Sequence, residues 1–511
     1  MRAQVNNRLM GDAEKLNMPR DVVIGAGVGG LCAAIALALA GRDVTVIEAQ
    51  THLGGKIRSL PSDAGPVDTG PTVLTMPDVF ETLFARAGAK LADYATLIPQ
   101  PILARHFWQG GAQLDLFTDT AANADAIGRF AGALAARDYL RFDRLTRAMY
   151  DAFNVPMMRA GKPKLGAIAL AAAKRPAIWP ALLPHMTLTR WLAGQFSDPR
   201  LIQLFGRYAT YVGGAPQKSP AVLALIWQAE AAGVWAVQGG MAALAAALVR
   251  LARERGVQFR CGIAAQHINV QNGRVAAVQL ADGSEIMARS VIFNGDPAAL
   301  TTGLFGQMAQ GAVRQSATQP RSLSANVWAF AAQINPDAPD LIHHNVFFGG
   351  NPAQDFGAIA RGRIARDPTL YICAQDRSSG DTPMTIERFE IIMNAASLQV
   401  GIPLNPHETD QCQTEMLTQL SRFNLHFQTP PPRAALTTPQ GWETLFPASM
   451  GAIYGRSPQS LLAPMLRPTA QTRIKGLYLA GGGVHPGAGV PMAALSGQHA
   501  AAAILTAPIS L

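Results

Sequence analysis

A glycine-rich turn near the N-terminus has the residue types and spacing that bind a diphosphate. Residues 25–30 read GAGVGG, after a short apolar run and before an alanine- and leucine-rich stretch. Gly25 permits the tight turn, Gly27 lets the backbone approach the diphosphate, and Gly30 lets the following helix lie against the strand. The free N–H groups and the dipole at the helix N-terminus attract negative charge. The turn therefore predicts a cradle for the ADP part of a dinucleotide.

The elements that must position this turn are present on both sides of it. The run 21–24 predicts a first strand, 31–41 a helix, and 44–47 a second strand that ends in Glu48. Strand, turn, helix and strand follow one another in the order of a Rossmann unit. Glu48 can accept hydrogen bonds from the ribose hydroxyls, and an acid at this position disfavours a 2′-phosphate. The arrangement argues against NADP and against a glycine-rich turn of no function.

A second cluster of glycine and basic residues follows the second strand. Residues 52–58 read HLGGKIR, and residues 68–72 read DTGPT. Gly55 can let the backbone pass close to a cofactor, and Lys56 or Arg58 can offer positive charge; the alternative is an ordinary basic turn. The segment resembles the extended signature of the flavin amine oxidase and phytoene desaturase superfamily. This resemblance implies FAD as the cofactor, with its ribityl-phosphate side near Gly55.

Glycines return near the C-terminus. Residues 477–497 read LYLAGGGVHPGAGVPMAALSG, a short apolar strand followed by a loop and a predicted helix. Backbone amides at the helix N-terminus can face the flavin ring and stabilise the negative charge that builds there during reduction; the alternative is a linker. The stretch resembles the C-terminal signature of the bacterial carotenoid desaturases. Gly482 stands where many members of the superfamily carry an acid, so binding at this point must rely on backbone amides.

The resemblance extends through the middle of the chain. Residues 198–244 follow the family pattern, and RYATYVGG (207–214), WQAEAAGVW (227–235) and GAIYG (451–455) are most similar to the 1-hydroxycarotenoid 3,4-desaturases, also called hydroxyneurosporene or methoxyneurosporene dehydrogenases. In the superfamily, a strand near Ala265, where valine is usual, offers backbone groups to the adenine. Motifs and resemblance together imply FAD contacts at Gly25, Ala26, Gly27, Gly29, Gly30, Glu48, Gly55, Lys56, Arg58, Ala265, Gly482, Gly483, Val490 and Met492.

The order of these motifs predicts how the chain is organised. We expect an α/β protein, with a Rossmann-type FAD-binding domain of the two-dinucleotide-binding-motif kind and a mixed-sheet substrate domain with a helical cap. The FAD-binding domain is expected to combine 21–90, 237–300 and 460–511, and the substrate domain 91–236 and 301–459. Residues 1–20 are polar and charged without an apolar core, which predicts a short mobile tail rather than a signal peptide.

Composition limits the classes of partner. Lys and Arg number 43 and Asp and Glu 34 among 511 residues, and the resulting net charge of +9 favours anionic partners. No nucleic-acid-binding module is recognisable. The four dispersed cysteines show no metal-ligand spacing, and no apolar run reaches the roughly 20 residues that a membrane span needs. We expect a cytoplasmic protein without a metal and without a nucleic acid partner.

Basic and aromatic residues are mixed within the expected cap. Residues 157–164, Lys174, Arg175 and Trp179 suit a segment that lies among lipid headgroups; the alternative is a solvated basic face beside a core helix. A C40 polyene lives in the bilayer and must enter from it. We therefore expect peripheral association with the inner, photosynthetic membrane. The expected partners are an acyclic carotenoid, the lipid surface, and oxygen or a quinone as electron acceptor.

The expected chemistry needs few catalytic side chains. A polyene C–H is too weak an acid for direct deprotonation, so hydride transfer from C4 to flavin N5, followed by proton loss from C3, is favoured. The candidate catalytic residues are Asp143 and Arg147, spaced i,i+4 on a predicted helix over 138–153, and His485 in the C-terminal loop. The alternatives are a surface ion pair for the first two and a structural turn residue for His485.

Three other functions stay open. Phytoene desaturase is the nearest alternative, because no short motif separates it on physical grounds. An amine or protoporphyrinogen oxidase usually has an aromatic pair flanking the flavin, for which Tyr454 and Tyr478 are the late candidates. Escort proteins of prenylated GTPases share the fold without using flavin, and their dinucleotide glycines need not be intact, whereas Gly25, Gly27 and Gly30 are present here.

Overall fold

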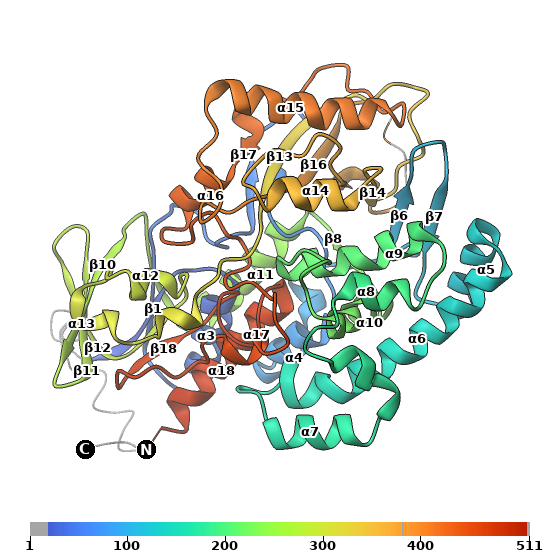
Figure 1. The fold of residues 1–511 in the computed structure, drawn as a ribbon. Coiled ribbons are helices and arrows are strands. Elements are labelled where there is room, and N and C mark those ends of the chain that lie inside the picture. Colours follow the sequence, from blue (N-terminus) through green and yellow to red (C-terminus); the bar gives the residue numbers. More distant parts are fainter. Residues whose placement is uncertain (1–18, 381–382, 384, 508–511) are drawn as a thin grey trace.

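The first of two large sheets carries the N-terminal glycine motif. The computed structural model describes residues 19–507 apart from 381, 382 and 384, so most of the expected tail lies outside the described residues. Five parallel strands lie in the order β9 (Gln258–Cys261), β2 (Val44–Glu48), β1 (Arg20–Ile24), β12 (Glu285–Phe293) and β18 (Leu477–Leu479). Two antiparallel strands, β11 (Arg274–Leu280) and β10 (Ala265–Gln271), continue from β12. Segments far apart in sequence therefore build one sheet (Figure 1).

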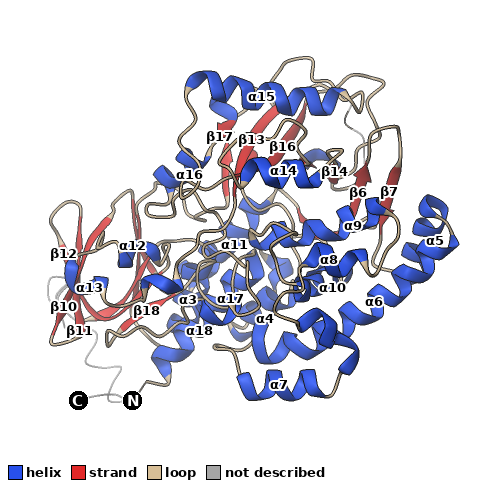
Figure 2. Ribbon diagram, in the orientation of Figure 1, coloured by secondary structure: helices blue, strands red, loops and turns tan. Residues whose placement is uncertain are grey.

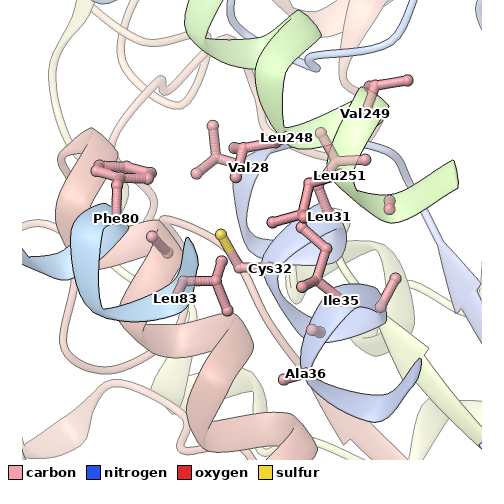
Figure 3. Packing of buried hydrophobic residues seen from close by; sticks show 14 of the residues in the cluster. Val28, Leu31, Cys32, Ile35, Ala36, Phe80, Leu83, Leu248, Val249 and Leu251 are labelled. Atoms are coloured by element: carbon pink, nitrogen blue, oxygen red, sulfur yellow. The ribbon is translucent and has the colours of Figure 1, made fainter. Parts of the chain in front are cut away.

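Four helices pack around the glycine motif and form the core of this half. They are α3 (Val28–Leu39), α4 (Asp78–Arg86), α11 (Met241–Glu254) and α18 (Val490–Leu505). Leu31 and Ile35 of α3 are fully buried in the same cluster as Leu83 and Leu248 (Figure 3). A Cβ atom on Gly497 would lie 1.9 Å from the carbonyl oxygen of Gly29, so α18 and α3 touch backbone to backbone. This contact brings the N-terminal and C-terminal glycine loops together.

The second sheet is mixed and forms the other half of the molecule. Its strand order is β17 (Leu436–Thr437), β13 (Ser324–Ala332), β16 (Glu387–Ala395), β15 (Leu370–Ala374), β14 (His344–Phe347), β6 (Ala104–Phe107) and β7 (Gln113–Leu116). Only the β14–β6 pair in this sheet is parallel. Helix α15 (Pro406–Ser421) covers one face (Figure 2), where Met416 and Leu420 pack with Phe330 and Phe389.

A group of helices covers the opposite side of the second sheet. The group comprises α5 (Thr120–Ala131), α6 (Ala133–Phe153), α7 (Leu165–Ala173), α8 (Leu188–Ala193), α9 (Pro199–Gly206), the 3-10 helix η5 (Arg207–Val212) and α10 (Ile226–Ala231). Its interior is aromatic: the rings of Phe142 and Phe205 lie 4.4 Å apart, and Trp227 is fully buried beside them. We call these helices the cap. Among the described residues, no helix is long and apolar enough to cross a bilayer.

The other strands and α-helices of the described residues are short. They are β3 (Arg58–Leu60), β4 (Val67–Thr69), β5 (Leu97–Pro99), β8 (Trp235–Val237), α12 (Ala298–Thr301), α13 (Gln307–Gln310), α14 (Pro352–Ile359), α16 (Pro439–Leu445) and α17 (Ala463–Leu466). The expected α/β class, with a Rossmann-type unit and a mixed second sheet, is confirmed. The expected domain boundaries stay a prediction.

Candidate functional site

One large cavity connects the glycine loops to the second sheet and the cap. Its volume is about 1180 Å³. The end nearest the first sheet is lined by the glycine loops and by Glu48. The wall beyond them includes apolar residues in and directly after β14, Val346 and Phe348, and apolar residues of the cap, Ile202 and Ile226. A cavity with a glycine-lined end and apolar wall residues beyond it fits a nucleotide cofactor beside an apolar substrate.

The first glycine turn is packed too tightly for side chains. A Cβ atom on Gly30 would lie 2.1 Å from the carbonyl oxygen of Gly25, so the helix lies directly against the turn. The Glu48 carboxylate accepts hydrogen bonds from the backbone N–H of Ala26 at 2.7 Å and of Gln50 at 2.9 Å. Glu48 also lines the cavity, and a carboxylate has lone pairs left for ribose hydroxyls. The turn and the acid fit the ADP part of FAD.

The second glycine pair lies against the first turn. The N–H of Gly54 donates to the Ala26 carbonyl at 3.0 Å, and a Cβ atom on Gly55 would lie 2.8 Å from the Cα of Gly27. Side chains at these positions would fill the space between the two loops. Arg58 turns toward the second sheet, where its Nη2 donates to Thr437 Oγ1 at 2.8 Å. The bare backbone of these loops forms the remainder of the cradle.

The C-terminal loop supplies further cavity wall. Gly482, Gly483, Val490 and Met492 line the cavity, as does Ala265 at the start of β10. Of the predicted FAD contacts, Ala26 and Gly30 are not on the cavity wall: Ala26 holds Glu48, and Gly30 packs on Gly25. All of them are therefore in or directly behind one cradle. Their individual contacts with FAD stay a prediction.

Two residues of the cofactor cradle were not predicted from the sequence. Asn294, at the end of β12, donates from Nδ2 to the Gly25 carbonyl at 3.0 Å and lines the cavity, and its buried Oδ1 has no partner. Arg467 donates from Nη1 to the Gly482 carbonyl at 3.1 Å, and burial lowers its pKa to about 10. Single polar residues outside any motif give no sequence signal of their own. The position of Asn294 directly after a parallel strand was the available hint.

The predicted catalytic pair does not lie at the cavity. Asp143 is buried inside the cap, where it accepts hydrogen bonds from Gln228 Nε2 at 2.8 Å, Trp227 Nε1 at 3.2 Å and Arg147 Nη2 at 3.0 Å. Neither Asp143 nor Arg147 is among the cavity-lining residues. The side of α6 that carries Asp143 faces the cap interior, so the carboxylate organises the cap. We therefore assign this pair no part in the chemistry.

His485 is also placed away from the cavity wall. Its Nε2 lies 2.9 Å from the carbonyl oxygen of Ala160 in the cap, and its buried Nδ1 has no partner. It does not line the cavity, and it ties the C-terminal loop to the cap. The predicted catalytic residues are thus not brought together, and the turn role considered for His485 agrees with its position.

A group of potential metal ligands lies on strands β14 and β15 of the second sheet and directly before β14. Ligand atoms of His343, His344 and Cys373 lie within 4.8 Å of one another, although the spacing of the cysteines gave no sign of it. His343 Nδ1 lies 3.0 Å from the Ala374 carbonyl, and His344 Nδ1 lies 2.6 Å from the Tyr371 hydroxyl. Each imidazole is therefore bonded to a protein group.

Lys56 predicts a pH dependence of cofactor binding. Its Nζ donates to the Ile453 carbonyl at 2.6 Å, and burial lowers its pKa to about 8, against about 10.4 for a free lysine. The side chain therefore loses its positive charge as the pH rises through 8. FAD is anionic, so we expect its affinity for wild-type apoprotein to fall several-fold between about pH 7 and about pH 9.5.

The measurement is fluorescence titration of FAD into apoprotein across this pH range. The matched control is Lys56→Met, which keeps the length of the side chain without a titrating amine. The variant should show a weaker but flatter profile. Parallel profiles for wild type and variant would contradict a role for this charge.

Comparisons with known proteins agree with the cradle. The family model "Flavin containing amine oxidoreductase" matches residues 28–505. The hydroxyneurosporene desaturase of Cereibacter sphaeroides is 55% identical over 96% of this chain and 98% of its own length. The enzyme of the same name from Rhodobacter capsulatus is 53% identical over 96% and 98%. A solved oxidoreductase from Methanosarcina mazei shares the fold, with a TM-score of 0.57 at 18% identity over 93% of this chain and 98% of that chain. The chain therefore belongs to the flavin-containing amine oxidoreductase family and is an FAD-dependent oxidoreductase.

Proposed function

We propose that the protein is a carotenoid desaturase that forms the C3–C4 double bond of 1-hydroxy or 1-methoxy acyclic carotenoids such as 1-hydroxyneurosporene. The observation that carries this proposal is the 55% identity to a hydroxyneurosporene desaturase over nearly the whole of both chains. The cavity wall near the second sheet and the cap supports it, because Val346, Phe348, Ile202 and Ile226 offer a polyene apolar contacts.

The residues of the chain have three tasks in such a reaction. FAD, when bound, supplies the acceptor for the hydride that leaves the carotenoid. The glycine loops and Glu48 hold the cofactor at one end of the cavity, and the apolar walls align the polyene and exclude water. Arg207 and Glu230 neutralise each other at 3.0 Å within the cap, which keeps an unpaired charge away from the bound polyene.

The test is anaerobic incubation of the FAD-loaded protein in liposomes with 1-hydroxyneurosporene or with phytoene. Flavin bleaching and carotenoid spectra are followed together. Bleaching with the hydroxylated polyene, with a red shift for one added double bond, is the expected result. Turnover of phytoene alone would make the protein a phytoene desaturase. Bleaching with neither substrate would reject a carotenoid desaturase.

The cap also supports a proposal for membrane attachment. Around α7, Leu165 is 60% exposed, Leu170 57% and Trp179 52%, so apolar groups face outward on a helix at the margin of the molecule (Figure 1). The exposed basic residues Lys162, Lys164 and Lys174 lie in the same segment. Apolar residues beside exposed lysines suit a surface that lies in anionic headgroups. Met158, which precedes this segment in the sequence, lines the cavity.

We expect the double variant Lys162→Gln/Lys164→Gln to bind anionic liposomes about thirtyfold more weakly at low salt, because each lysine near the surface contributes on the order of 1 kcal/mol. Cosedimentation with vesicles of 30% phosphatidylserine measures it. The control is Arg314→Gln/Arg361→Gln, which removes two exposed charges outside the cap. Equal losses in both double variants would show a general charge effect and contradict attachment through α7.

A further inference from the structure

The wall of the cavity holds an open chain of hydrogen bonds. Thr72 lines the cavity, and its Oγ1 lies 2.8 Å from the hydroxyl of Tyr371, which also lines it. The same hydroxyl lies 2.6 Å from Nδ1 of His344. His344 is 1% exposed, and its Nε2 has no hydrogen-bond partner. The chain thus begins in the protein interior and ends at a side chain on the cavity.

In a second polar cluster at the cavity wall, the side chains already bond one another. Arg207 and the hydroxyls of Tyr208 and Tyr211 all bond the Glu230 carboxylate, at 3.0, 2.7 and 2.5 Å. Arg207 Nη1 also donates to the Tyr211 hydroxyl at 2.6 Å. Both tyrosine protons are directed at Glu230, so neither is free for a ligand. This group serves the wall itself.

The positions of the protons decide whether the Thr72 end of the hydrogen-bond chain donates or accepts. His344 is buried without a charged partner in this hydrogen-bond chain, and a neutral imidazole carries one ring proton. With that proton on Nδ1, His344 donates to Tyr371, Tyr371 donates to Thr72, and the Thr72 proton is free to point into the cavity. This order leaves the unpartnered Nε2 as a bare lone pair rather than a buried N–H without an acceptor. The open end is therefore a hydrogen-bond donor.

The position of Thr72 fits an oxygen close to the reacting carbons. Gly70 is pressed against the cofactor cradle, because a Cβ atom on it would lie 2.1 Å from the carbonyl oxygen of Lys56. Thr72 follows two residues later, and Val73 and Met76 continue the wall beyond it. Three carbon–carbon bonds separate C1 from C4 of the carotenoid, a span on the order of 4 Å. The group that binds the C1 oxygen must therefore lie beside the cradle.

We propose that Thr72, oriented by Tyr371 and His344, donates a hydrogen bond to the C1 oxygen of the acyclic carotenoid. The inference rests on the proposed function and adds the residue that selects oxygenated carotenoids. A donor suits an ether as well as a hydroxyl, since both offer lone pairs, so 1-hydroxy and 1-methoxy carotenoids should both bind. A carotenoid without the oxygen leaves the Thr72 proton unpaired in an apolar wall, which disfavours binding.

The test compares dissociation constants of two carotenoids of equal chain length, with and without a 1-hydroxyl group. The 3,4-didehydro compounds are used because the 3,4 bond is already formed. Binding to the FAD-loaded protein is followed by quenching of tryptophan fluorescence. Wild type should prefer the 1-hydroxy compound by about tenfold, and Thr72→Val, which keeps the shape but removes the hydroxyl, should lose this preference. Because Thr72→Val also removes the donor that the compound without oxygen leaves unpaired, its affinity for this compound should equal or exceed that of wild type.

Two further variants keep the test decisive. Thr210→Val removes another cavity-lining hydroxyl, one that donates to the Arg207 carbonyl at 2.7 Å, and should keep the tenfold preference. Tyr371→Phe interrupts the hydrogen-bond chain behind Thr72 and should reduce the preference for the 1-hydroxy compound. It replaces Thr72→Val as the test if that variant does not fold. A preference that survives in Thr72→Val, or is missing from wild type, overturns the assignment. Failure of wild type to bind either compound would instead count against the proposed carotenoid substrate.

Discussion

Gly30→Ala is expected to purify without FAD. The new Cβ atom would lie 2.1 Å from the carbonyl oxygen of Gly25, 2.9 Å from Asn294 Nδ2 and 3.1 Å from Val23 Cγ1. Two of these neighbours belong to β1 and its turn, and Asn294 is fixed by its bond to Gly25, so none of them can move without displacing the cradle. Helix α3 must shift from β1, and overpacking of this kind costs about 1–3 kcal/mol.

The fall in FAD affinity should be larger than the lower folding stability alone would cause. The diphosphate site is formed by the turn and the first N–H groups of α3, and a shift of the helix misdirects all of them at once. We expect FAD affinity to fall more than a hundredfold, measured by the ratio of flavin to protein absorbance and by FAD titration. Gly311→Ala is the control, because a Cβ atom there meets nothing within 4 Å. A Gly30→Ala protein with a full complement of FAD would refute this account of the turn.

The FAD-binding half could be predicted because its signals are local. Turn, helix and Glu48 follow one another within 21–48, and each residue type has a direct physical reason to be there. The C-terminal loop could be predicted equally well, because glycines between a strand and a helix have few roles other than binding a cofactor. The sequence could not show that α18 presses on α3 through Gly497, because that contact joins the two ends of the chain.

The substrate side was less predictable because its polar groups come from distant segments. Thr72 follows β4, and His344 and Tyr371 lie on β14 and β15, so the three meet only when these distant strands assemble. None of them stands in a motif that predicts this contact. Asp143 and Arg147, the predicted catalytic pair, lie away from the cavity wall for a related reason. Their i,i+4 spacing was correct, and they do form an ion pair at 3.0 Å. The spacing could not tell that no residue of α6 lines the cavity.

Glu230→Ala is expected to destabilise the protein more than any surface change. Arg207 and Glu230 form an ion pair at 3.0 Å with side chains only 8% and 2% exposed. Tyr208 and Tyr211 donate to the same carboxylate at 2.7 and 2.5 Å. Removing the carboxylate leaves a buried guanidinium and two buried hydroxyls without their acceptor. Breaking a buried pair in this way costs about 3–5 kcal/mol.

The destabilisation by Glu230→Ala should come from the unpaired charge of Arg207 rather than from the lost side-chain volume. A second variant separates the two causes. Glu230→Leu/Arg207→Met replaces both partners by apolar groups, and such replacements are often neutral. We expect the double variant to recover most of the fall in thermal midpoint that Glu230→Ala causes. The exposed pair Arg250–Glu254, also 3.0 Å apart, supplies the control: Glu254→Ala should leave the midpoint unchanged within error. If Glu230→Ala behaves like Glu254→Ala, water reaches the cap interior and solvates the unpaired guanidinium of Arg207. If the double variant is as unstable as Glu230→Ala, packing rather than charge sets the cost.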